Sequence, residues 1–518
     1  MSDSKPGNVG SEGVSRKRPD RAAEVANTFE WLITAFILAF VFRAFVMEAF
    51  RIPTGSMADT LKGAHFRLRC EQCGYRYDFG FQPERYGLLE DTVPSGNVRI
   101  KEPTRCPSCG HYAFPGKELP VANGDRILVL KCIYQFFEPK QWDVVVFRNP
   151  DKPKINYIKR LIGRPGETLW IIDGDVYING QISRKPPKVQ EELWMPVYDN
   201  DYQPVNSDEP SFNGHRWQQP FDTDNSGWTI DEINPTIFQL DSPPDQINVM
   251  TYDALKGNDV NTTYAYDDLG QYRLMPYCSD LMLRFYVDGL DLAKVVGAEL
   301  SKYGIHYKSW VNVGDGNGKV MMRIVRVLNG KEQLLNERSI EIKEAMMAPK
   351  LVKFANVDHQ LIFQFGEEKL IYDLGRGVED AGRITQNIRP QIKIFGAGKL
   401  VLSHLAIFRD IHYIEVRSIG NEPGRATQGN PFKLEKDEFF VLGDNSPNSE
   451  DSRFWSRPGK ANWGKSYTEG VVPREYLVGK AMFVYWPSGF KPFAGSRFAV
   501  IPNVGQMRFI YGGSNKRR

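Results

Sequence analysis

The segment FRIPTGSMADTL, from Phe50 to Leu61, places Ser56 between a glycine and a methionine directly after an apolar stretch. Such a serine is either part of a turn, because proline, glycine and serine all favour turns, or it is a nucleophile. A catalytic serine needs an exposed hydroxyl, a nearby base and hydrogen-bond donors for the oxyanion. If Ser56 is a nucleophile, the chain must supply a base elsewhere.

The best candidate base is Lys159 in INYIKRLIGRPGETL, an apolar and β-branched strand that ends at a Gly-Arg-Pro-Gly turn. Burial lowers the pKa of a lysine, and a neutral amine can accept a proton from a serine. The alternative is an ordinary exposed lysine on a strand. None of the seven histidines lies in a recognisable catalytic motif, although a triad assembled in space stays open.

A third stretch, FFVLGDNSPNSEDSRFW (439–455), runs from a hydrophobic strand into a turn that carries acidic, amide and hydroxyl side chains. A solvated turn or a calcium loop would also be rich in Asp and Asn. The regular alternation of oxygen ligands that an EF-hand loop requires is absent from this sequence.

In chain order, the motifs IPTGSM, GDRILV, YIKRLIGRPGE and GDNSPNSEDSR resemble the boxes of type I signal peptidases. The resemblance implies a membrane-anchored serine endopeptidase that removes signal peptides from exported preproteins. It implies an all-β catalytic domain behind an N-terminal transmembrane helix, and no cofactor for catalysis. Ser56 corresponds to the nucleophile and Lys159 to the general base, while the hydroxyl of Thr54 and the Ser56 N–H correspond to the oxyanion donors.

The loop after the third strand supplies the supporting residues that the resemblance implies. Ser449 corresponds to the hydroxyl that orients the lysine, Asp451 and Arg453 to the pair that braces the loop, and Asp444 to a further supporting residue. Pro447 stands where the family usually has an acidic residue, which puts the bracing contacts of the loop in question but leaves Ser449 unaffected.

An apolar stretch precedes the serine. WLITAFILAFVF (31–42) is uncharged, and only Arg43 and Glu48 interrupt its continuation to Phe50. The stretch has about the length of a membrane helix and lacks an Ala-x-Ala cleavage pattern. We expect a disordered cytoplasmic tail at 1–27 and an uncleaved anchor at 28–50. The alternative is a helix of a soluble domain.

The positive-inside rule then gives the orientation, because the basic run SRKRPDR precedes the anchor. It predicts a single-pass protein of the bacterial cytoplasmic membrane with its N-terminus inside and its catalytic domain on the outer face. The 518 residues predict two or more domains. The net charge of +3, from 66 basic and 63 acidic residues, argues against nucleic-acid binding.

Two C-x-x-C knuckles, CEQC (70–73) and CPSC (106–109), make a tetrahedral zinc site of four cysteines plausible. Each knuckle is followed by glycine and an aromatic residue, as in zinc ribbons. Two disulfides are the competing interpretation in an exported segment. The predicted metal ligands are Cys70, Cys73, Cys106 and Cys109, whereas Cys132 and Cys278 resemble isolated thiols.

Short alternating segments such as LMLRFYVDGL and KLVKFANVDHQLIFQF predict a β-sandwich between 194 and 412, of a pattern similar to concanavalin-like or laminin-G-like jelly rolls. Such sandwiches often bind glycans, so a glycan or another envelope component is one candidate partner, and a structural insert without a ligand is the alternative.

The expected fold is therefore mainly β. The predicted domains are a catalytic domain from three segments (51–69, 115–193 and 413–500), a zinc-ribbon-like insertion at 70–114, the sandwich at 194–412 and a C-terminal tail at 501–518. The expected partners are signal peptides of preproteins and membrane lipid. The alternative function is a non-catalytic envelope binding protein on a peptidase scaffold.

Overall fold

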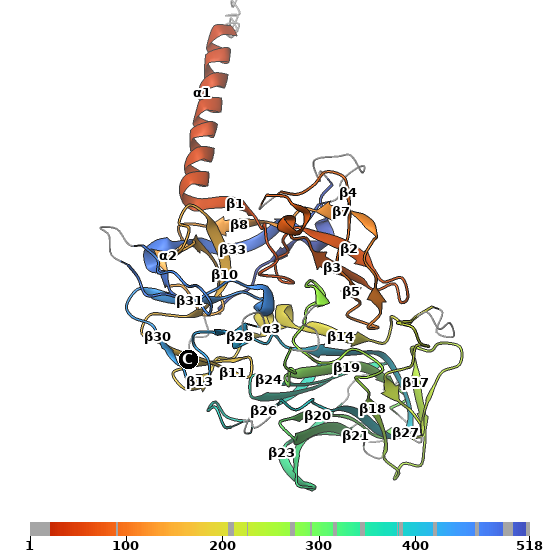
Figure 1. Cartoon of the computed structure of the whole chain (residues 1–518). Coiled ribbons are helices and arrows are strands. Elements are labelled where there is room, and N and C mark those ends of the chain that lie inside the picture. Colours follow the sequence, from red (N-terminus) through yellow and green to blue (C-terminus); the bar gives the residue numbers. More distant parts are fainter. Residues whose placement is uncertain are drawn as a thin grey trace, which may run out of the picture.

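The computed structural model describes residues 21–513 except 90–91, 206–211, 225, 270–274, 291–292, 314–318, 342–347, 381, 383–386, 418–421, 461–465 and 490–500. Strands dominate the described residues, and one long helix projects from the body of the molecule (Figure 1). The predicted mainly-β fold with an N-terminal apolar helix is therefore confirmed.

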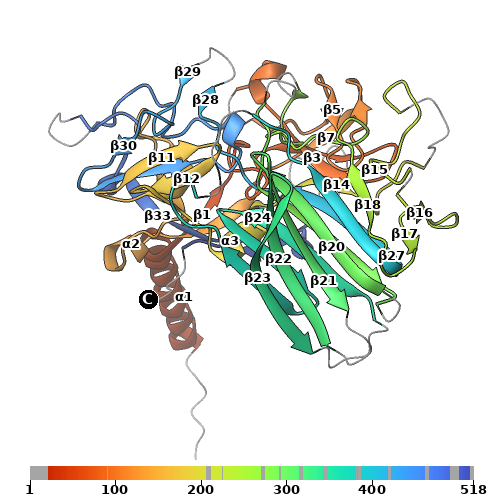
Figure 2. The ribbon, with the colours of Figure 1, turned by 90° about the horizontal axis from the view of Figure 1, so that it is seen from below.

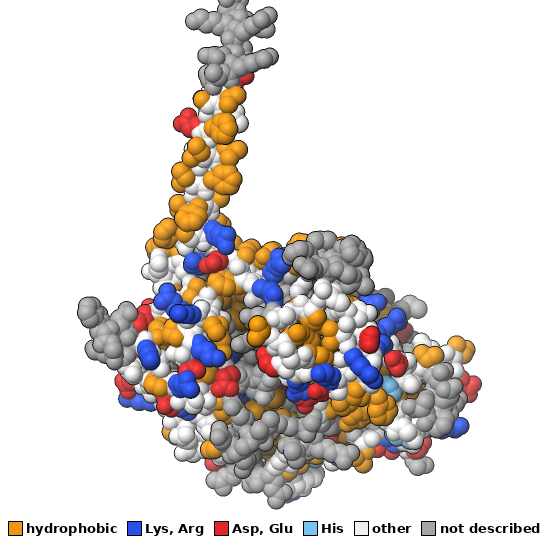
Figure 3. Space-filling view, turned by 45° about the horizontal axis from the view of Figure 1, so that its top comes forward, with side chains coloured by type: hydrophobic (Ala, Val, Ile, Leu, Met, Phe, Trp, Pro, Cys, Tyr) orange, Lys and Arg blue, Asp and Glu red, His pale blue; other side chains and the backbone are white. Residues whose placement is uncertain are grey.

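Helix α1 (Arg21–Val41) continues through a helical turn at Phe42–Val46. Residues Glu24–Val46 form a candidate membrane span of 23 residues, none of it buried in the protein. Figure 3 shows this helix as a mainly apolar rod outside the body. The exposed apolar surface is what a lipid environment would cover.

Two predicted boundaries of this region were wrong. The helix begins at Arg21, inside the predicted disordered tail 1–27, of which 1–20 lie outside the described residues. The helix begins earlier than predicted because alanine has the highest helix propensity, and this segment contains Ala22, Ala23 and Ala26. The helical segment ends at Val46 rather than at Phe50, because 47–51 form strand β1, which pairs with β8.

The sheet that carries the candidate dyad has eight strands in the order β1-β8-β33-β9-β10-β31-β32, with β34 pairing β33. Its interior positions are apolar and buried, as in β9, where the four valine and phenylalanine side chains have almost no exposed surface. Short helix α2 (Ile133–Phe136) follows β8. The strand bounds are β1 (Met47–Arg51), β8 (Arg126–Leu130), β9 (Val144–Arg148), β10 (Asn156–Gly163), β31 (Glu438–Leu442), β32 (Val472–Pro473), β33 (Leu477–Trp486) and β34 (Arg508–Phe509).

The prediction of a C-terminal tail at 501–518 was wrong in part, because strand β34 lies within this segment. Two residues of this tail pair with β33, and the neighbouring Ile510 is buried in the core beneath the sheet. A two-residue strand is too short to show an alternating pattern in the sequence, so only its tertiary partner reveals it.

A second sheet of four strands lies beside the first, in the order β13-β12-β11-β30. Helix α3 (Pro187–Leu193) packs Val189 and Leu193 into an apolar core that also contains side chains of β11, β12 and β31. The strands are β11 (Thr168–Ile172), β12 (Asp175–Ile178), β13 (Gln181–Ile182) and β30 (Phe432–Lys433), and a separate pair is formed by β28 (Val416–Arg417) and β29 (Glu422–Pro423).

The cysteine knuckles belong to a small β unit. A sheet in the order β3-β2-β7-β4 and the hairpin β5-β6 form it. This sheet uses residues on both sides of the predicted 70–114 insertion. Its strands are β2 (His65–Arg69), β3 (Arg76–Gly80), β4 (Asn97–Arg99), β5 (Thr104–Arg105), β6 (Tyr112–Ala113) and β7 (Glu118–Ala122).

The largest assembly is a fourteen-stranded β-sandwich, visible at the lower right of Figure 2. Its 18-residue strand β27 joins the two halves, pairing first with β20 and then with β19. Alternate side chains, as in β25, enter one large apolar core. The strands are β14 (Met195–Asp199), β15 (Phe221–Asp222), β16 (Trp228–Ile230), β17 (Phe238–Asp241), β18 (Asn248–Tyr252), β19 (Leu281–Asp288), β20 (Ala293–Lys302), β21 (Ile305–Val313), β22 (Lys319–Leu328), β23 (Lys331–Glu341), β24 (Lys350–Val357), β25 (Gln360–Phe365), β26 (Glu368–Asp373) and β27 (Ile392–Arg409).

A buried ionic cluster joins the sandwich to the four-stranded sheet that contains β12. Lys302 of β20 pairs with Asp280 and lies 3.5 Å from Asp175 of β12. Lys185 pairs with Asp358 and lies 2.8 Å from Asp410. The four carboxylates are close enough to hold a metal ion, but the two ammonium groups already supply positive charge, which buried carboxylates require.

Candidate active site

Ser56 lies in a tight turn directly after strand β1. The segment before it is held by hydrogen bonds from Ile52 N–H to the Asp125 carbonyl, 2.8 Å, and from Ala64 N–H to the Pro53 carbonyl, 3.2 Å. The turn closes through a bond of 3.0 Å from Ala58 N–H to the Gly55 carbonyl. The turn-forming residues of the motif thus hold Ser56 in a defined turn after β1.

Lys159 reaches this serine from strand β10, where it pairs with Val145 of β9. Its Nζ lies 2.6 Å from Ser56 Oγ, and the lysine is 3% exposed. Burial lowers the pKa of Lys159 to about 8, although the carboxylates of Asp451 and Asp444 oppose this shift. The structure therefore brings together the two residues that the sequence selected, with an amine that is partly neutral near physiological pH.

The loop after β31 packs behind the pair. Gly443 has no room for a side chain, because a Cβ atom there would lie 2.2 Å from Ser449 Oγ and 2.5 Å from the Ser56 carbonyl oxygen. Two residues after Gly443, the N–H of Asn445 donates a hydrogen bond of 3.1 Å to the same Ser56 carbonyl. Ser449 is buried at this contact; its predicted role in orienting Lys159 stays a prediction.

Asp451 and Arg453 form a fully buried ion pair with two hydrogen bonds, 2.8 and 2.9 Å long. Burial by itself would raise the pKa of Asp451, but the Arg453 guanidinium, the Gly443 N–H and the Ser449 hydroxyl hold it below its usual value. Arg453 also donates to Ser446 Oγ. These bracing contacts form although Pro447 replaces an acidic residue beside them.

Asp444 accepts two hydrogen bonds from Arg160, 2.8 and 2.6 Å long, and neither side chain is exposed. Arg160 follows Lys159 directly, so this pair connects strand β10 to the loop after β31. Thr54, the predicted oxyanion donor, has an exposed side chain two residues before Ser56. Its role in binding an oxyanion stays a prediction.

Sequence reasoning missed three supporting groups. Asp125 accepts hydrogen bonds from Lys62 N–H and the Ser488 hydroxyl, and its position in the GDRILV motif was a signal that could have identified it. Arg160 could have been recognised from its place beside Lys159. The third group lies in segment 258–268 of the sandwich, and no local pattern in the sequence marks it.

The four predicted cysteine ligands also come together. Both knuckles have the same geometry, with Gly74 and Gly110 at φ of 75° and 76° and each knuckle closed by a backbone bond to its first cysteine carbonyl. The positive φ explains the glycine after each C-x-x-C. The sulfur atoms pair across the knuckles, with Cys70 and Cys109 Sγ 3.7 Å apart and Cys73 and Cys106 Sγ 3.6 Å apart.

These separations fit a metal better than disulfides. Four sulfur atoms at about 2.3 Å from a tetrahedral zinc ion lie about 3.8 Å from one another, whereas a disulfide bond is about 2.05 Å long. All four cysteines are free, buried and within 4.8 Å of one another. We propose that they hold a structural zinc ion.

The purified protein should accordingly contain about one zinc per chain by elemental analysis, and Cys73→Ser should lose it. Cys132→Ser is the matched control, because Cys132 lies outside the cluster and should leave the zinc content unchanged. Absence of zinc, together with a mass that shows two disulfides, would overturn the assignment.

Two segments of the chain, 116–219 and 415–486, match the family model described as signal peptidase, peptidase S26. Signal peptidase I of Rickettsia canadensis is 30% identical over 153 residues, which are 29% of this chain and 42% of that protein. Signal peptidase I T of Bacillus subtilis is 42% identical over 64 residues, or 12% of this chain and 33% of that protein. The match therefore spans less than half the length of these relatives.

Comparison with solved structures gives a weaker likeness. The carbohydrate-binding module CBM66 from Bacillus subtilis aligns with 36% of this chain and 95% of its own, at 10% identity and a TM-score of 0.24. This similarity is too low to inform the role of the sandwich. The sequence matches, in contrast, confirm the resemblance to type I signal peptidases that the motifs predicted.

Proposed function

We propose that this chain is a type I signal peptidase, a membrane-anchored serine endopeptidase that removes N-terminal signal peptides from exported preproteins. The observation that carries the proposal is the 2.6 Å contact between Ser56 Oγ and Lys159 Nζ. It lies in a chain of which two segments match the signal peptidase family. The burial of Lys159 supports its role as a base.

In the proposed reaction, Ser56 attacks the scissile carbonyl while neutral Lys159 accepts the hydroxyl proton. The Ser56 N–H and the Thr54 hydroxyl stabilise the oxyanion of the tetrahedral intermediate. Lys159 then protonates the leaving amine. In the second half of the reaction, Lys159 accepts a proton from a water molecule, which attacks the acyl-enzyme and releases the acyl group from Ser56. No step requires a metal; the proposed zinc ion is structural.

The substrate can bind as an additional strand. Strand β10 pairs with β9 along Asn156–Arg160, whereas its described pairing with β31 begins only at Arg160. The backbones of Asn156 and Ile158 therefore offer one edge to an extended peptide, a common mode of peptide recognition. This edge leads directly to Lys159. We expect small side chains at the first and third positions before the cut, as the family resemblance implies.

The proposed location is the outer face of the bacterial cytoplasmic membrane, with the N-terminus in the cytoplasm. The basic run before α1 supports this orientation. Strand β1 begins at Met47, directly after the candidate span ends at Val46, and Ser56 follows nine residues later. This short connection would hold the nucleophile near the membrane surface, where a signal peptide leaves the bilayer.

The alternative, a non-catalytic binding protein on a peptidase scaffold, lacks a supporting observation. Burial of a lysine lowers the stability of the folded protein, so a protein without catalytic function would gain nothing from a buried lysine next to a serine. For the sandwich, a glycan or envelope partner also stays without support from the described residues.

The direct test is to incubate the full-length protein in detergent micelles with a preprotein and to map the products by mass spectrometry. We expect one cut after the signal peptide by the native protein and none by Ser56→Ala, which should unfold at the same temperature. Equal cleavage by Ser56→Ala, or no cleavage of any preprotein by the native protein, would contradict the proposal.

A further inference from the structure

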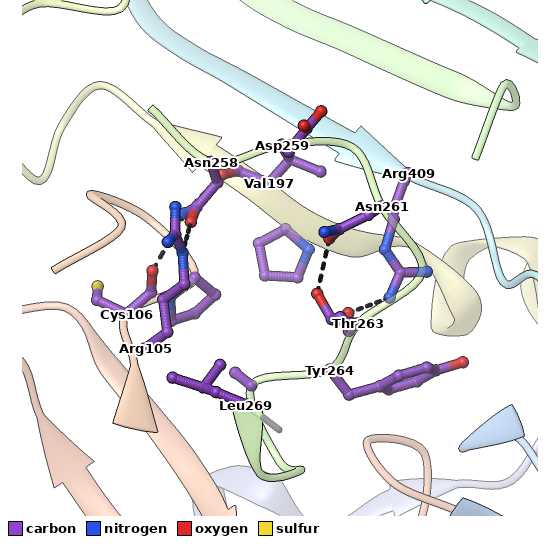
Figure 4. A pocket seen from close by; sticks show the side chains of 13 residues that line it. Arg105, Cys106, Val197, Asn258, Asp259, Asn261, Thr263, Tyr264, Leu269 and Arg409 are labelled. Carbon is purple, nitrogen blue, oxygen red and sulfur yellow. Dashed lines mark hydrogen bonds between the residues drawn. The ribbon is translucent and has the colours of Figure 1, made fainter. Parts of the chain in front are cut away.

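The segment 258–268 of the sandwich, here called the bridging loop, leaves β18 and crosses to the candidate active site. Its first residue and its middle are held by the surrounding structure, as Figure 4 shows. Asn258 donates to the Cys106 carbonyl, 3.1 Å, at the second cysteine knuckle. Arg409, at the end of β27, donates to the Thr263 carbonyl and lies with its guanidinium 4.9 Å from the ring centre of Tyr264. The loop is therefore a fixed element.

The second half of the loop contacts the segment that carries Asp444. The hydroxyl of Tyr264 donates to the Asp444 carbonyl at 2.8 Å. Asp267 Oδ1 accepts hydrogen bonds from the side-chain amides of Asn445, 2.8 Å, and Asn448, 3.1 Å. The N–H of Asn445 in turn donates to the Ser56 carbonyl. One residue, Asn445, thus links the inserted loop to the backbone of the nucleophile.

Tyr266 covers the other side of the nucleophile turn. A Cβ atom on Gly55 would lie 2.2 Å from its ring, so the ring fills the space beside this glycine. Its hydroxyl donates to the Ala64 carbonyl at 3.0 Å, and the Ala64 N–H donates to Pro53 in the same turn. The bridging loop therefore covers the turn, although it lies outside both segments that match the family model.

We infer that the sandwich completes the catalytic centre through the bridging loop, in which Tyr264, Tyr266 and Asp267 are positioning residues for Ser56. This inference rests on the proposed peptidase function. A glycine-containing turn has considerable conformational freedom of its own. A displacement of about 1 Å between reacting groups can lower the rate by about 100-fold. External supports on both sides of the turn therefore matter for the 2.6 Å contact of the dyad.

Attachment of the sandwich does not depend on these contacts alone. The buried cluster of Lys302 and Lys185 joins the same two parts of the chain. Tyr303 of the sandwich also donates its hydroxyl to Asp173, and Tyr177 bonds His359 at 2.9 Å. If the bridging loop only attached the sandwich to the peptidase part, the other contacts would maintain this attachment. Loss of a bridging-loop contact would then affect catalysis no more than loss of one of these other contacts.

The experiment compares Tyr264→Phe with Tyr303→Phe in the full-length protein. Each variant removes one sandwich hydroxyl that bonds the peptidase part, but only Tyr264 bonds the Asp444 carbonyl. We expect Tyr264→Phe to lower kcat about 10-fold with little change in KM, and Tyr303→Phe to leave kcat unchanged. Hydrogen exchange at Gly55–Ala58 should be faster in Tyr264→Phe only.

Asp267 supplies an independent variant. Asp267→Ala removes both amide contacts and should lower kcat about 100-fold, whereas Asp267→Asn keeps a carbonyl oxygen at the accepting position and should recover most of it. Equal kcat in Tyr264→Phe, Tyr303→Phe and the native protein, or no recovery in Asp267→Asn, would overturn the inference. Failure of the proposed function has a different signature, because Ser56→Ala would then match the native protein.

Discussion

Lys159→Met should abolish preprotein cleavage and leave the protein folded. Methionine has a similar length and suits the apolar strand, but it cannot accept the proton of Ser56. The loss in kcat should be about 1,000-fold, in the middle of the range of about 100- to 10,000-fold that general-base assistance contributes. Lys159→Arg should be equally inactive, because a guanidinium group stays protonated. The measurement is the rate of preprotein cleavage by the full-length protein.

The pH dependence provides a second test of the same residue. Activity of the native protein should rise through about pH 8, the lowered pKa of Lys159, because only the neutral amine acts as a base. The buried ammonium destabilises the fold below this pH, and the cost disappears as pH approaches the unfolded value of about 10.5. Lys159→Met should therefore be at least as stable as the native protein at pH 7, with an advantage that shrinks towards pH 10.5.

Near-native turnover by folded Lys159→Met would refute the dyad and would return the PTGSM segment to the status of a turn. A flat activity profile between pH 7 and 9 in the native protein would contradict the lysine as base in the same way.

Asp444→Ala should produce the largest loss of stability among single substitutions at the site. It leaves Arg160 fully buried without its carboxylate partner. The free energy of unfolding should fall by about 3 to 5 kcal/mol, the usual cost of breaking a buried ion pair from one side. Denaturant unfolding of the full-length protein in detergent micelles measures this change.

Asp373→Ala is the matched control, because Asp373 makes the same two-pronged contact with Arg184 but its side chain is 51% exposed. Its loss should be much smaller. Arg160→Met combined with Asp444→Ala should lose less stability than the sum of the two single changes, because no unpaired charge remains. Additive losses would show that the pair does not act as a unit.

Removal of Asp444 should also shift the activity profile to lower pH. Its carboxylate raises the pKa of Lys159, and the uncompensated Arg160 guanidinium left behind would disfavour the ammonium form further. The residual activity of Asp444→Ala should therefore reach its plateau at a lower pH than that of the native protein.

Local residue patterns determined much of this protein. Alternating apolar positions predicted the β-sandwich, and an uncharged run predicted the apolar helix, because both signals lie within one element. Ser56 and Lys159 could be selected from the sequence because each lies in a short motif with a chemical reason for its residue type. The C-x-x-C knuckles carry their own local geometry, including the glycine that follows each of them.

Boundaries were less predictable. Residues 47–50 are apolar except for Glu48 and could continue the apolar helix, yet they belong to β1 because β8 offers a partner. The strand at Arg508–Phe509 has two residues and depends on β33 in the same way. Strand pairing between distant segments decides such cases, and no local pattern records it.

The tertiary structure alone decided which groups surround the dyad. Asp444 lies 284 residues from Arg160 in the chain, and Tyr264 lies 180 residues from Asp444. A tyrosine in a polar segment of the sandwich has no local feature that distinguishes it from any other. Its partner is a backbone carbonyl, which every residue carries, so only the packing of the sandwich against the peptidase sheet could assign the contact. The sequence thus identified the candidate dyad, whereas long-range packing determined which groups hold Ser56 and Lys159 in place.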